Sequence, residues 1–243
     1  MLPFWIALQF LSSLPIRLPG MPTPQQSGRS LLFYPLVGLL FGLLLLALDQ
    51  VLEGSPLLLH AALLLGAWVM LSGGLHLDGL ADSADAWLGG FGDRERTLVI
   101  MKDPRSGPIA VVTLVVVLLL KLSAALALVE AHCSLGLLLA PVIARTAMLA
   151  LFMNTPYVRP GGLGQALANH LPRKAGLRVL ATVVLFCVFM GGWAAVWVLL
   201  ICTGSFFWLR RVMIRRLGGS TGDTAGAMLE LLETLVLVTL ALM

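Results

Sequence analysis

The sequence predicts an all-α, polytopic integral membrane bundle that forms a single domain over residues 1–243. Its composition is 59% apolar and 12% charged, with a mean hydropathy of +0.97, whereas soluble domains carry about 25% charged residues. Apolar stretches that approach the roughly 20 residues needed to cross a bilayer recur along the chain. Because a soluble domain does not repeat such stretches, we expect lipid to surround most of the chain.

We expect about seven transmembrane spans. They are residues 31–52, 56–75, 109–129, 135–154, 177–190, 193–209 and 225–242. Only Gly191 and Gly192 separate the fifth span from the sixth, so this region is either two short spans joined by a tight turn or one long broken helix; we favour two. The apolar run from Leu2 to Leu14 lacks a charged flank and carries proline at both ends, so we expect a short N-terminal interfacial or re-entrant helix rather than a signal peptide.

Basic residues alternate along the chain as a membrane topology requires. Lys and Arg gather before the first span and in the loops at about 76–108, 155–176 and 210–224, while the short turns between contain no Lys or Arg. Since basic loops stay in the cytoplasm, the pattern predicts a cytoplasmic N-terminus, three cytoplasmic loops and an outer C-terminus. A single helix over the fifth and sixth spans would move the last basic loop outside, so the charges support two.

The net charge of +4 could in principle indicate a nucleic-acid partner. The basic residues lie in loops beside the membrane, however, where they attract acidic headgroups and anionic substrates. We therefore expect the lipid bilayer, and no nucleic acid, as the partner of these loops.

An acidic helix continues the second expected span towards the cytoplasm. Asp78, Asp82 and Asp85 follow one another at spacings of four and three residues, so their carboxylates share one helix face. Like charges stacked beside a bilayer are costly, and a divalent cation would remove the cost. Hard oxygen ligands without cysteine favour Mg²⁺, with Mn²⁺ also suitable. We expect the nearby His76 to orient a group at this site rather than to bind the metal.

Two further polar clusters lie in the expected cytoplasmic loops. Residues 101–107 combine an acid, two bases and turn residues, and residues 218–224 form a glycine-rich turn before the last span. Backbone N–H groups at such a helix start can hold phosphate oxygens, although this turn alone is no more specific than a helix cap. The candidate phosphate or metal contacts in these clusters are Lys102, Asp103, Arg105, Gly219, Ser220, Thr221 and Asp223.

Four charged residues fall inside the expected spans, namely Lys121, Arg145, Glu230 and Glu233. Charges at membrane depth need partners and are functional hypotheses by default. Glu230 and Glu233 lie one helical turn apart, so pairing with the two basic residues inside the bundle is our favoured interpretation. Direct contact with a ligand or metal is the alternative.

Four segments resemble, in the same order, the cobalamin synthase family, whose members are also called adenosylcobinamide-GDP ribazoletransferases. The segment at residues 73–86 reads GGLHLDGLADSADA and carries the family signature; the other three are residues 33–38, 101–107 and 219–224. The resemblance covers nearly the whole chain. One departure is Ala110, where a second glycine is expected, and it concerns only the local shape of the loop.

The resemblance implies a multi-pass enzyme of the bacterial cytoplasmic (inner) membrane, with its active site facing the cytoplasm, late in vitamin B12 biosynthesis. Such an enzyme joins adenosylcobinamide-GDP to α-ribazole or α-ribazole 5′-phosphate. It forms adenosylcobalamin or its 5′-phosphate, releases GMP and requires Mg²⁺. A homo-oligomer, or association with other late cobalamin enzymes, is compatible with this function.

As a mechanism hypothesis, the ribose 3′-hydroxyl of the ribazole attacks the phosphorus on the cobinamide arm, and GMP leaves. Asp78 and Asp82 are then the expected metal ligands, and Asp85 is a further ligand or the base that accepts the hydroxyl proton. The second-tier ligands are Asp103 and Asp223. Lys102, Arg105 and the turn at residues 219–221 are the expected phosphate contacts.

Two other classes of protein share some of these features. A CDP-alcohol phosphatidyltransferase also uses Mg²⁺ and aspartates, but the terminal glycine and spaced acids of its signature are missing here. A secondary transporter would use the four intramembrane charges as a relay. Against it, the sequence shows no inverted repeat, and the densest polar chemistry lies at the ends of the spans.

Overall fold

The computed structural model describes residues 1–243 apart from the side chain of Leu163. The described chain is all-helical, with one isolated bridge between Tyr157 and Ser220. The helices are α1 (Leu2–Leu11), α2 (Pro24–Ser30), the 3₁₀ turn η1 (Leu31–Phe33), α3 (Tyr34–Val51), α4 (Leu57–Ser72), α5 (Leu75–Gly89), α6 (Arg94–Ile100), α7 (Pro108–Glu130), α8 (Leu135–Asn154), α9 (Leu163–Asn169), α10 (Arg173–Leu217) and α11 (Gly222–Ala241).

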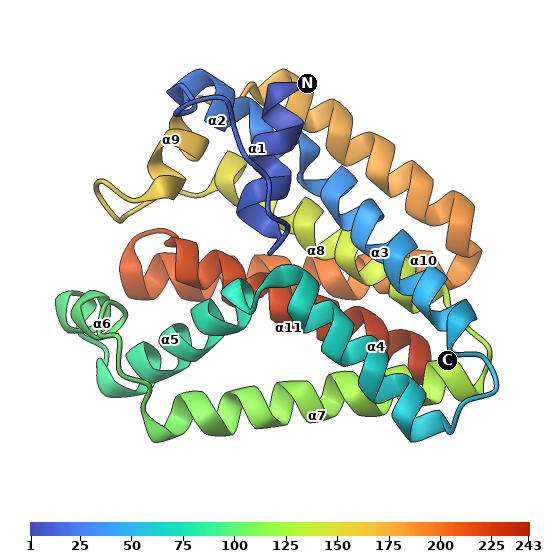
Figure 1. The fold of residues 1–243 in the computed structure, drawn as a ribbon. Coiled ribbons are helices and arrows are strands. Elements are labelled where there is room, and N and C mark those ends of the chain that lie inside the picture. The colour runs from blue at the N-terminus through green and yellow to red at the C-terminus, as the bar shows by residue number, and fades with distance from the viewer.

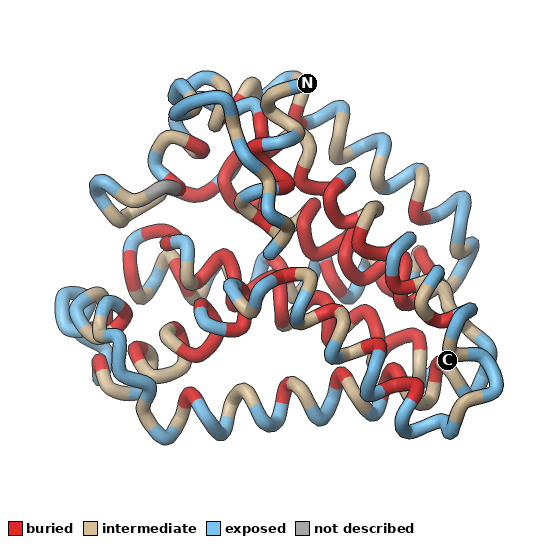
Figure 2. Tube along the Cα trace, viewed as in Figure 1, coloured by how far each residue is buried: buried red, intermediate tan, exposed pale blue. Residues whose placement is uncertain are grey.

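Helices α8 and α11 form the centre of the bundle. In each of them 78% of the most apolar 18-residue stretch is buried. The corresponding share is 28% for α7 and 17% for α10. Figure 2 shows the same contrast, with buried residues gathered at the centre and exposed ones along the outer helices. The exposed residues of α7 and α10 include many Val, Leu, Phe and Trp side chains. An apolar exterior of this kind is expected where lipid replaces water as the solvent.

Five of the described helical segments are long and apolar enough to cross a membrane, and the bent pair α4–α5 raises the number to six. These segments confirm an all-helical, multi-pass membrane bundle. The expected number of seven is reached only if α10 is counted as two crossings.

Helix α10 contains the break expected at the glycine pair. Gly192 has non-helical angles, with φ of 52° and ψ of −133°, although helical structure runs from Arg173 to Leu217. Figure 1 shows the helix doubling back on itself, so that it forms two legs, residues 173–191 and 193–217. The two legs are therefore separate helices that join at Gly192, where a turn between two spans was expected.

The prediction that the acidic helix continues the second span was wrong in its direction. Helix α4 ends at Ser72, and α5 leaves it at an angle of 86°. Gly73 and Gly74 make this bend with φ values of 64° and 71°, which glycine adopts without steric cost. As a result α5 packs across α11 and α7 instead of extending α4.

The N-terminal apolar run forms the expected short helix, α1. Ala7 and Leu11 are fully buried against the bundle, and the ring of Phe10 stacks on Tyr34 with centroids 6.4 Å apart. Three short polar helices in the loops, α2, α6 and α9, were not predicted. Local capping explains two of them, because Thr23 caps α2 with a capping box and Asp93 caps α6.

Candidate active site

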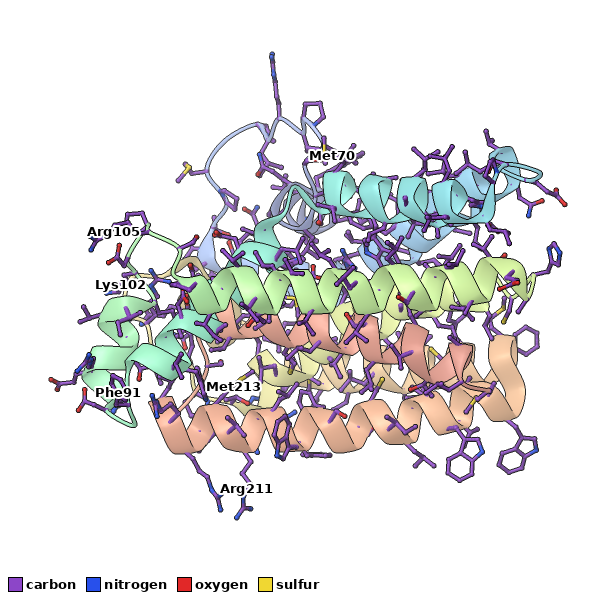
Figure 3. The ribbon with its side chains drawn as sticks, turned by 90° about the horizontal axis from the view of Figure 1, so that it is seen from below. Met70, Phe91, Lys102, Arg105, Arg211 and Met213 are labelled. Atoms are coloured by element: carbon purple, nitrogen blue, oxygen red, sulfur yellow. The ribbon has the colours of Figure 1, made fainter. Side chains whose placement is uncertain are left out.

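A pocket of about 530 Å³ lies where the loops before α7 and after α8 meet α5 and α11. Its apolar walls come from α1, α8 and α9. The polar residues that line it are His76, Asp78, Lys102, Tyr157, Arg159 and Asp223. Figure 3 shows Lys102 and Arg105 together at this end of the bundle. The pocket thus combines acids and bases taken from four separate parts of the sequence.

Close packing between α5 and α11 brings the acids together. A Cβ atom on Gly79 would lie 2.8 Å from the carbonyl oxygen of Asp223, so no larger residue fits between the two helices without moving them. Asp78 and Asp82 flank this contact one turn apart on α5, and Asp223 lies in the first turn of α11. Of the three acids predicted from spacing, Asp78 and Asp82 thus lie beside Asp223, which we expected as a second-tier ligand.

The charge on Asp82 is disfavoured in the absence of a cation. Burial raises the pKa of this half-buried carboxyl to about 6, and repulsion from Asp78 and then from Asp223 adds to the shift. A bound divalent cation would reverse this repulsion, because opposite charge favours the ionised carboxylate. The local electrostatics therefore fit a cation beside these three acids.

Arg159 pairs with Asp223 at the wall of the pocket. Its Nη1 donates to Asp223 Oδ2 at 2.8 Å, and the guanidinium has further donors that can reach an anionic ligand. In the sequence, Arg159 is simply one of the basic residues of the expected cytoplasmic loop at about 155–176. It lies 64 residues before Asp223, and no motif spacing connects the two, so the pair becomes visible only in the fold.

Asp85 also lies on α5, but its carboxylate binds backbone N–H groups at the start of α7. Its Oδ2 accepts a hydrogen bond from the Gly107 N–H at 2.5 Å, and its Oδ1 accepts one from the Ala110 N–H at 2.9 Å. Asp85 thus caps the start of α7, where backbone N–H groups lack helical partners. This contact also fixes the end of the loop that carries Lys102.

Asp103 and Arg105 form an exposed pair outside the pocket lining. Arg105 donates from Nε and Nη2 to the two carboxylate oxygens of Asp103, at 2.9 and 2.7 Å. These hydrogen bonds lower the pKa of Asp103 to about 2. The two charges satisfy each other, and of the predicted contacts in this loop only Lys102 lines the pocket.

The glycine-rich turn is buried beneath the pocket. Ser220 and Thr221 are both fully enclosed, and Thr221 caps α11 through a hydrogen bond with Thr224. Ser220 is bound through its backbone to residues 156 and 158, at 2.8 and 2.9 Å. Of the turn and the start of α11, only Gly222 and Asp223 line the pocket, so phosphate contact through the Ser220 and Thr221 hydroxyls is not supported by their positions.

His76 lies at the floor of the pocket and is only 2% exposed. Its Nε2 has no hydrogen-bond partner among the described residues. Burial lowers the pKa of this imidazole to about 3, with repulsion from Arg145 as the next cause. The imidazole is therefore neutral, and its orienting role stays a prediction.

The four intramembrane charges pair with one another, as we favoured. Lys121 donates to Glu230 and Glu233 at 2.6 Å each, and Arg145 donates to Glu233 at 2.8 Å. All four side chains are at most 4% exposed. The cluster joins α7, α8 and α11 through balanced charges.

No group of three His, Cys, Asp or Glu side chains within the described part of the chain has a ready-made metal-binding geometry. Mg²⁺ is usually held by one or two carboxylates together with water and substrate phosphate. Asp78 and Asp223 offer oxygen ligands at the wall of the open pocket, and Asp82 lies one turn further along α5. This donor set fits that mode of binding.

The fold and the pocket define a class of protein: a multi-pass helical membrane protein with an acidic site beside basic residues, suited to phosphorylated substrates. The cobalamin-5-phosphate synthase family matches residues 3–241 of the chain. The chain therefore belongs to that family.

Several curated relatives resemble the chain over their full length. The adenosylcobinamide-GDP ribazoletransferase of Pseudomonas savastanoi pv. phaseolicola is 74% identical over 243 residues, which cover 100% of both chains. Enzymes of the same name from Pseudomonas fluorescens Pf-5 and Pseudomonas putida W619 are 73% and 69% identical, covering 100% of this chain and 100% and 99% of theirs. No solved structure matches the chain.

Proposed function

We propose that this protein is an adenosylcobinamide-GDP ribazoletransferase that joins adenosylcobinamide-GDP to α-ribazole, or its 5′-phosphate, and releases GMP. Membership of the family and the name of its close relatives support this activity. The structural observation that carries the proposal is the meeting of Asp78 with the Asp223–Arg159 pair at one pocket. Asp82 lies near enough for Asp78 and Asp223 to raise its pKa. A secondary transporter does not explain that meeting, and the family match separates the chain from the CDP-alcohol phosphatidyltransferases.

The residues around the pocket fit Mg²⁺ as the metal of this reaction. Asp78 and Asp82 would hold it, with Asp223 as a further oxygen ligand. Bound Mg²⁺ neutralises charge on a pyrophosphate and orients it for displacement. Asp103 is paired with Arg105 at the surface, so we assign it no ligand role.

Lys102 and Arg159 supply positive charge on the walls of the pocket. We infer that they hold non-bridging oxygens of the pyrophosphate, with the Gly222 backbone at the start of α11 as a third contact. Phosphoryl transfer of this kind depends on positioning and charge neutralisation more than on covalent help from the protein. Because both oxygens of Asp85 accept backbone N–H bonds, we assign it to positioning the Lys102 loop.

The transfer reaction is tested by measuring GMP release in detergent micelles. Release should require adenosylcobinamide-GDP, α-ribazole and Mg²⁺ together. Asp82→Asn keeps the size of the side chain and removes its charge, so turnover should fall on the order of a hundredfold. Glu95→Gln, which changes an exposed acid on α6, is the matched control and should keep full turnover.

Two results would contradict these assignments. Folded wild-type protein that releases no GMP with all three components present would remove the transferase activity. Unchanged turnover and unchanged Mg²⁺ dependence in Asp82→Asn would remove the metal site while leaving the transferase activity in place.

We also propose a topology of seven crossings, with the N-terminus and the acidic pocket on the cytoplasmic side. The two legs of α10 count as separate crossings, α4 supplies the second, and α5 belongs to the cytoplasmic segment that follows it. Cys133, in the turn between α7 and α8, is half-buried, while Cys187 and Cys202 are buried. A membrane-impermeant maleimide should therefore label Cys133 in spheroplasts, and should label a Ser106→Cys, Cys133→Ser variant only in inverted vesicles. The reverse pattern would overturn the orientation.

A further inference from the structure

A groove of about 470 Å³ lies between the two legs of α10 and the side of α8. Apolar side chains from all three segments line it, including Ala147, Ala150, Val183, Leu199 and Phe206. At its rim, Val184 is 47% and Phe207 is 59% exposed. The groove is therefore an apolar channel on the outer face of the bundle, at the level of the membrane-crossing helices.

A basic pocket continues this groove at one end. It has a volume of about 560 Å³ and is lined by Phe207, Trp208, Arg210, Arg211, Ile214 and Arg215. Phe207 and Arg210 line both spaces, so the groove and the pocket are contiguous. Figure 3 shows Arg211 projecting outward from α10, away from the other helices. An apolar channel thus ends at a cluster of arginines.

The residue types in the cluster are typical of the level of lipid headgroups. Trp208 is 65% exposed and lies beside the arginines, and exposed tryptophans mark the boundary between hydrocarbon and headgroups. Arg211 and Arg215 are also exposed, with no acidic residue anywhere along α10. Basic pockets at this depth between membrane helices are suited to phosphate headgroups.

We propose that the groove and the basic pocket together bind one anionic phospholipid. An acyl chain occupies the groove, and the headgroup phosphate contacts Arg211 and Arg215. A second copy of this chain fits less well as occupant, because its membrane-exposed helices α7 and α10 offer no acid within the spans to face the arginines. The lipid supplies both the apolar chain and the negative charge that this surface lacks.

Arg210 connects the lipid site to the segment that carries Arg159. Its Nε donates to Thr155 Oγ1 at 3.0 Å, and its Nη2 donates to the Asn154 carbonyl at 2.5 Å. Residues 156–159 follow directly and end at the wall of the pocket. Because Arg210 lines both the groove and the basic pocket, the lipid packs against the side chain that holds the backbone leading to Arg159.

The experiment measures lipid binding by native mass spectrometry, and thermal stability, on the full-length protein in a neutral detergent. Phosphatidylglycerol, phosphatidylcholine and inorganic phosphate are compared as probes. We expect phosphatidylglycerol to bind at least about tenfold more tightly than phosphatidylcholine, equivalent to about 1.4 kcal/mol, and inorganic phosphate to give no stabilisation.

Two variants and one control locate the site. The double change Arg211→Gln with Arg215→Gln removes the headgroup contacts, and Ala150→Phe fills the groove. Each should weaken phosphatidylglycerol binding about tenfold. Arg173→Gln changes an exposed basic residue at the start of α10 that lines neither space, and it should bind the lipid as the wild type does.

Four results would overturn the proposal. Equal affinity for phosphatidylcholine would remove the headgroup site, and stabilisation by inorganic phosphate alone would show a simple anion site. Equal weakening by Arg173→Gln would show that general surface charge attracts the lipid. A dimer that survives delipidation, and that Ala150→Phe dissociates, would identify a second copy of the chain as the occupant.

Discussion

The buried charge cluster gives a quantitative prediction about stability. Glu230, Glu233, Lys121 and Arg145 form two negative and two positive charges, each at most 4% exposed. Glu230→Gln leaves two cations facing one carboxylate, and Lys121→Met leaves two carboxylates facing one cation. Removing one partner of a buried ion pair costs about 3–5 kcal/mol, a large part of a total stability of about 5–15 kcal/mol.

The double variant Lys121→Met with Glu230→Gln should recover most of this loss. It restores charge balance and keeps the bond of 2.8 Å between Arg145 and Glu233. We expect it to lose no more than about 2 kcal/mol. Because the two single losses together are at least about 6 kcal/mol, the coupling energy between the two sites should be at least about 4 kcal/mol. Cation–aromatic contact adds little to this difference, although Lys121 Nζ lies 4.9 Å from the ring centre of Trp68.

Unfolding in mixed detergent micelles, followed by circular dichroism as the denaturing detergent is increased, measures these free energies. Glu130→Gln, at the exposed end of α7, is the matched control and should change stability by less than about 0.5 kcal/mol. Additive losses in the double variant would refute the reasoning, because they would mean that the two charges do not sense each other. Losses below about 1 kcal/mol in both single variants would also refute it.

Three further predictions concern the pocket. Gly79→Ala inserts a methyl group 2.8 Å from the Asp223 carbonyl; it should cost about 1–3 kcal/mol in thermal unfolding and abolish GMP release. Without metal, the pKa of Asp82 is about 6 in the folded protein, whereas in the unfolded chain the same carboxyl loses its proton near pH 4. The free energy of unfolding should therefore fall as pH rises from about 4 to 7. We expect a fall of only about 1 kcal/mol because solvent screens this partly buried group, and Asp82→Asn should show no such fall in a series of melting measurements. Asp85→Asn should leave Mg²⁺ affinity, measured by calorimetry, within about twofold while raising KM; a large loss of affinity would restore Asp85 as a ligand.

Local patterns predicted those features that depend on neighbouring residues alone. The spacing of Asp78 and Asp82 placed both on one face of a helix, and the glycine pair marked the break in α10. The pairing of the intramembrane charges could be predicted because isolated charges are too costly in a bilayer. These predictions needed no knowledge of which helices are neighbours.

Features that depend on the packing of distant helices were missed. The only sequence signal for the bend of 86° between α4 and α5 is the pair Gly73–Gly74, and a glycine pair is equally compatible with a helix that continues. Asp85 resembled its neighbours in sequence, yet its carboxylate reaches across to cap α7. Arg159 reaches Asp223 only because the loop after α8 folds over the start of α11.

The backbone pairing of Ser220 with residues 156 and 158 limits how parts of related enzymes can be exchanged. Both strands of this small bridge lie in loops, where insertions and substitutions are otherwise tolerated best. Replacing only one of these loops with that of a relative would supply only one side of the hydrogen-bonded bridge. It would also replace only one member of the Arg159–Asp223 pair. Chimeras between members of the family should therefore function only when residues 155–159 and 218–223 come from the same parent.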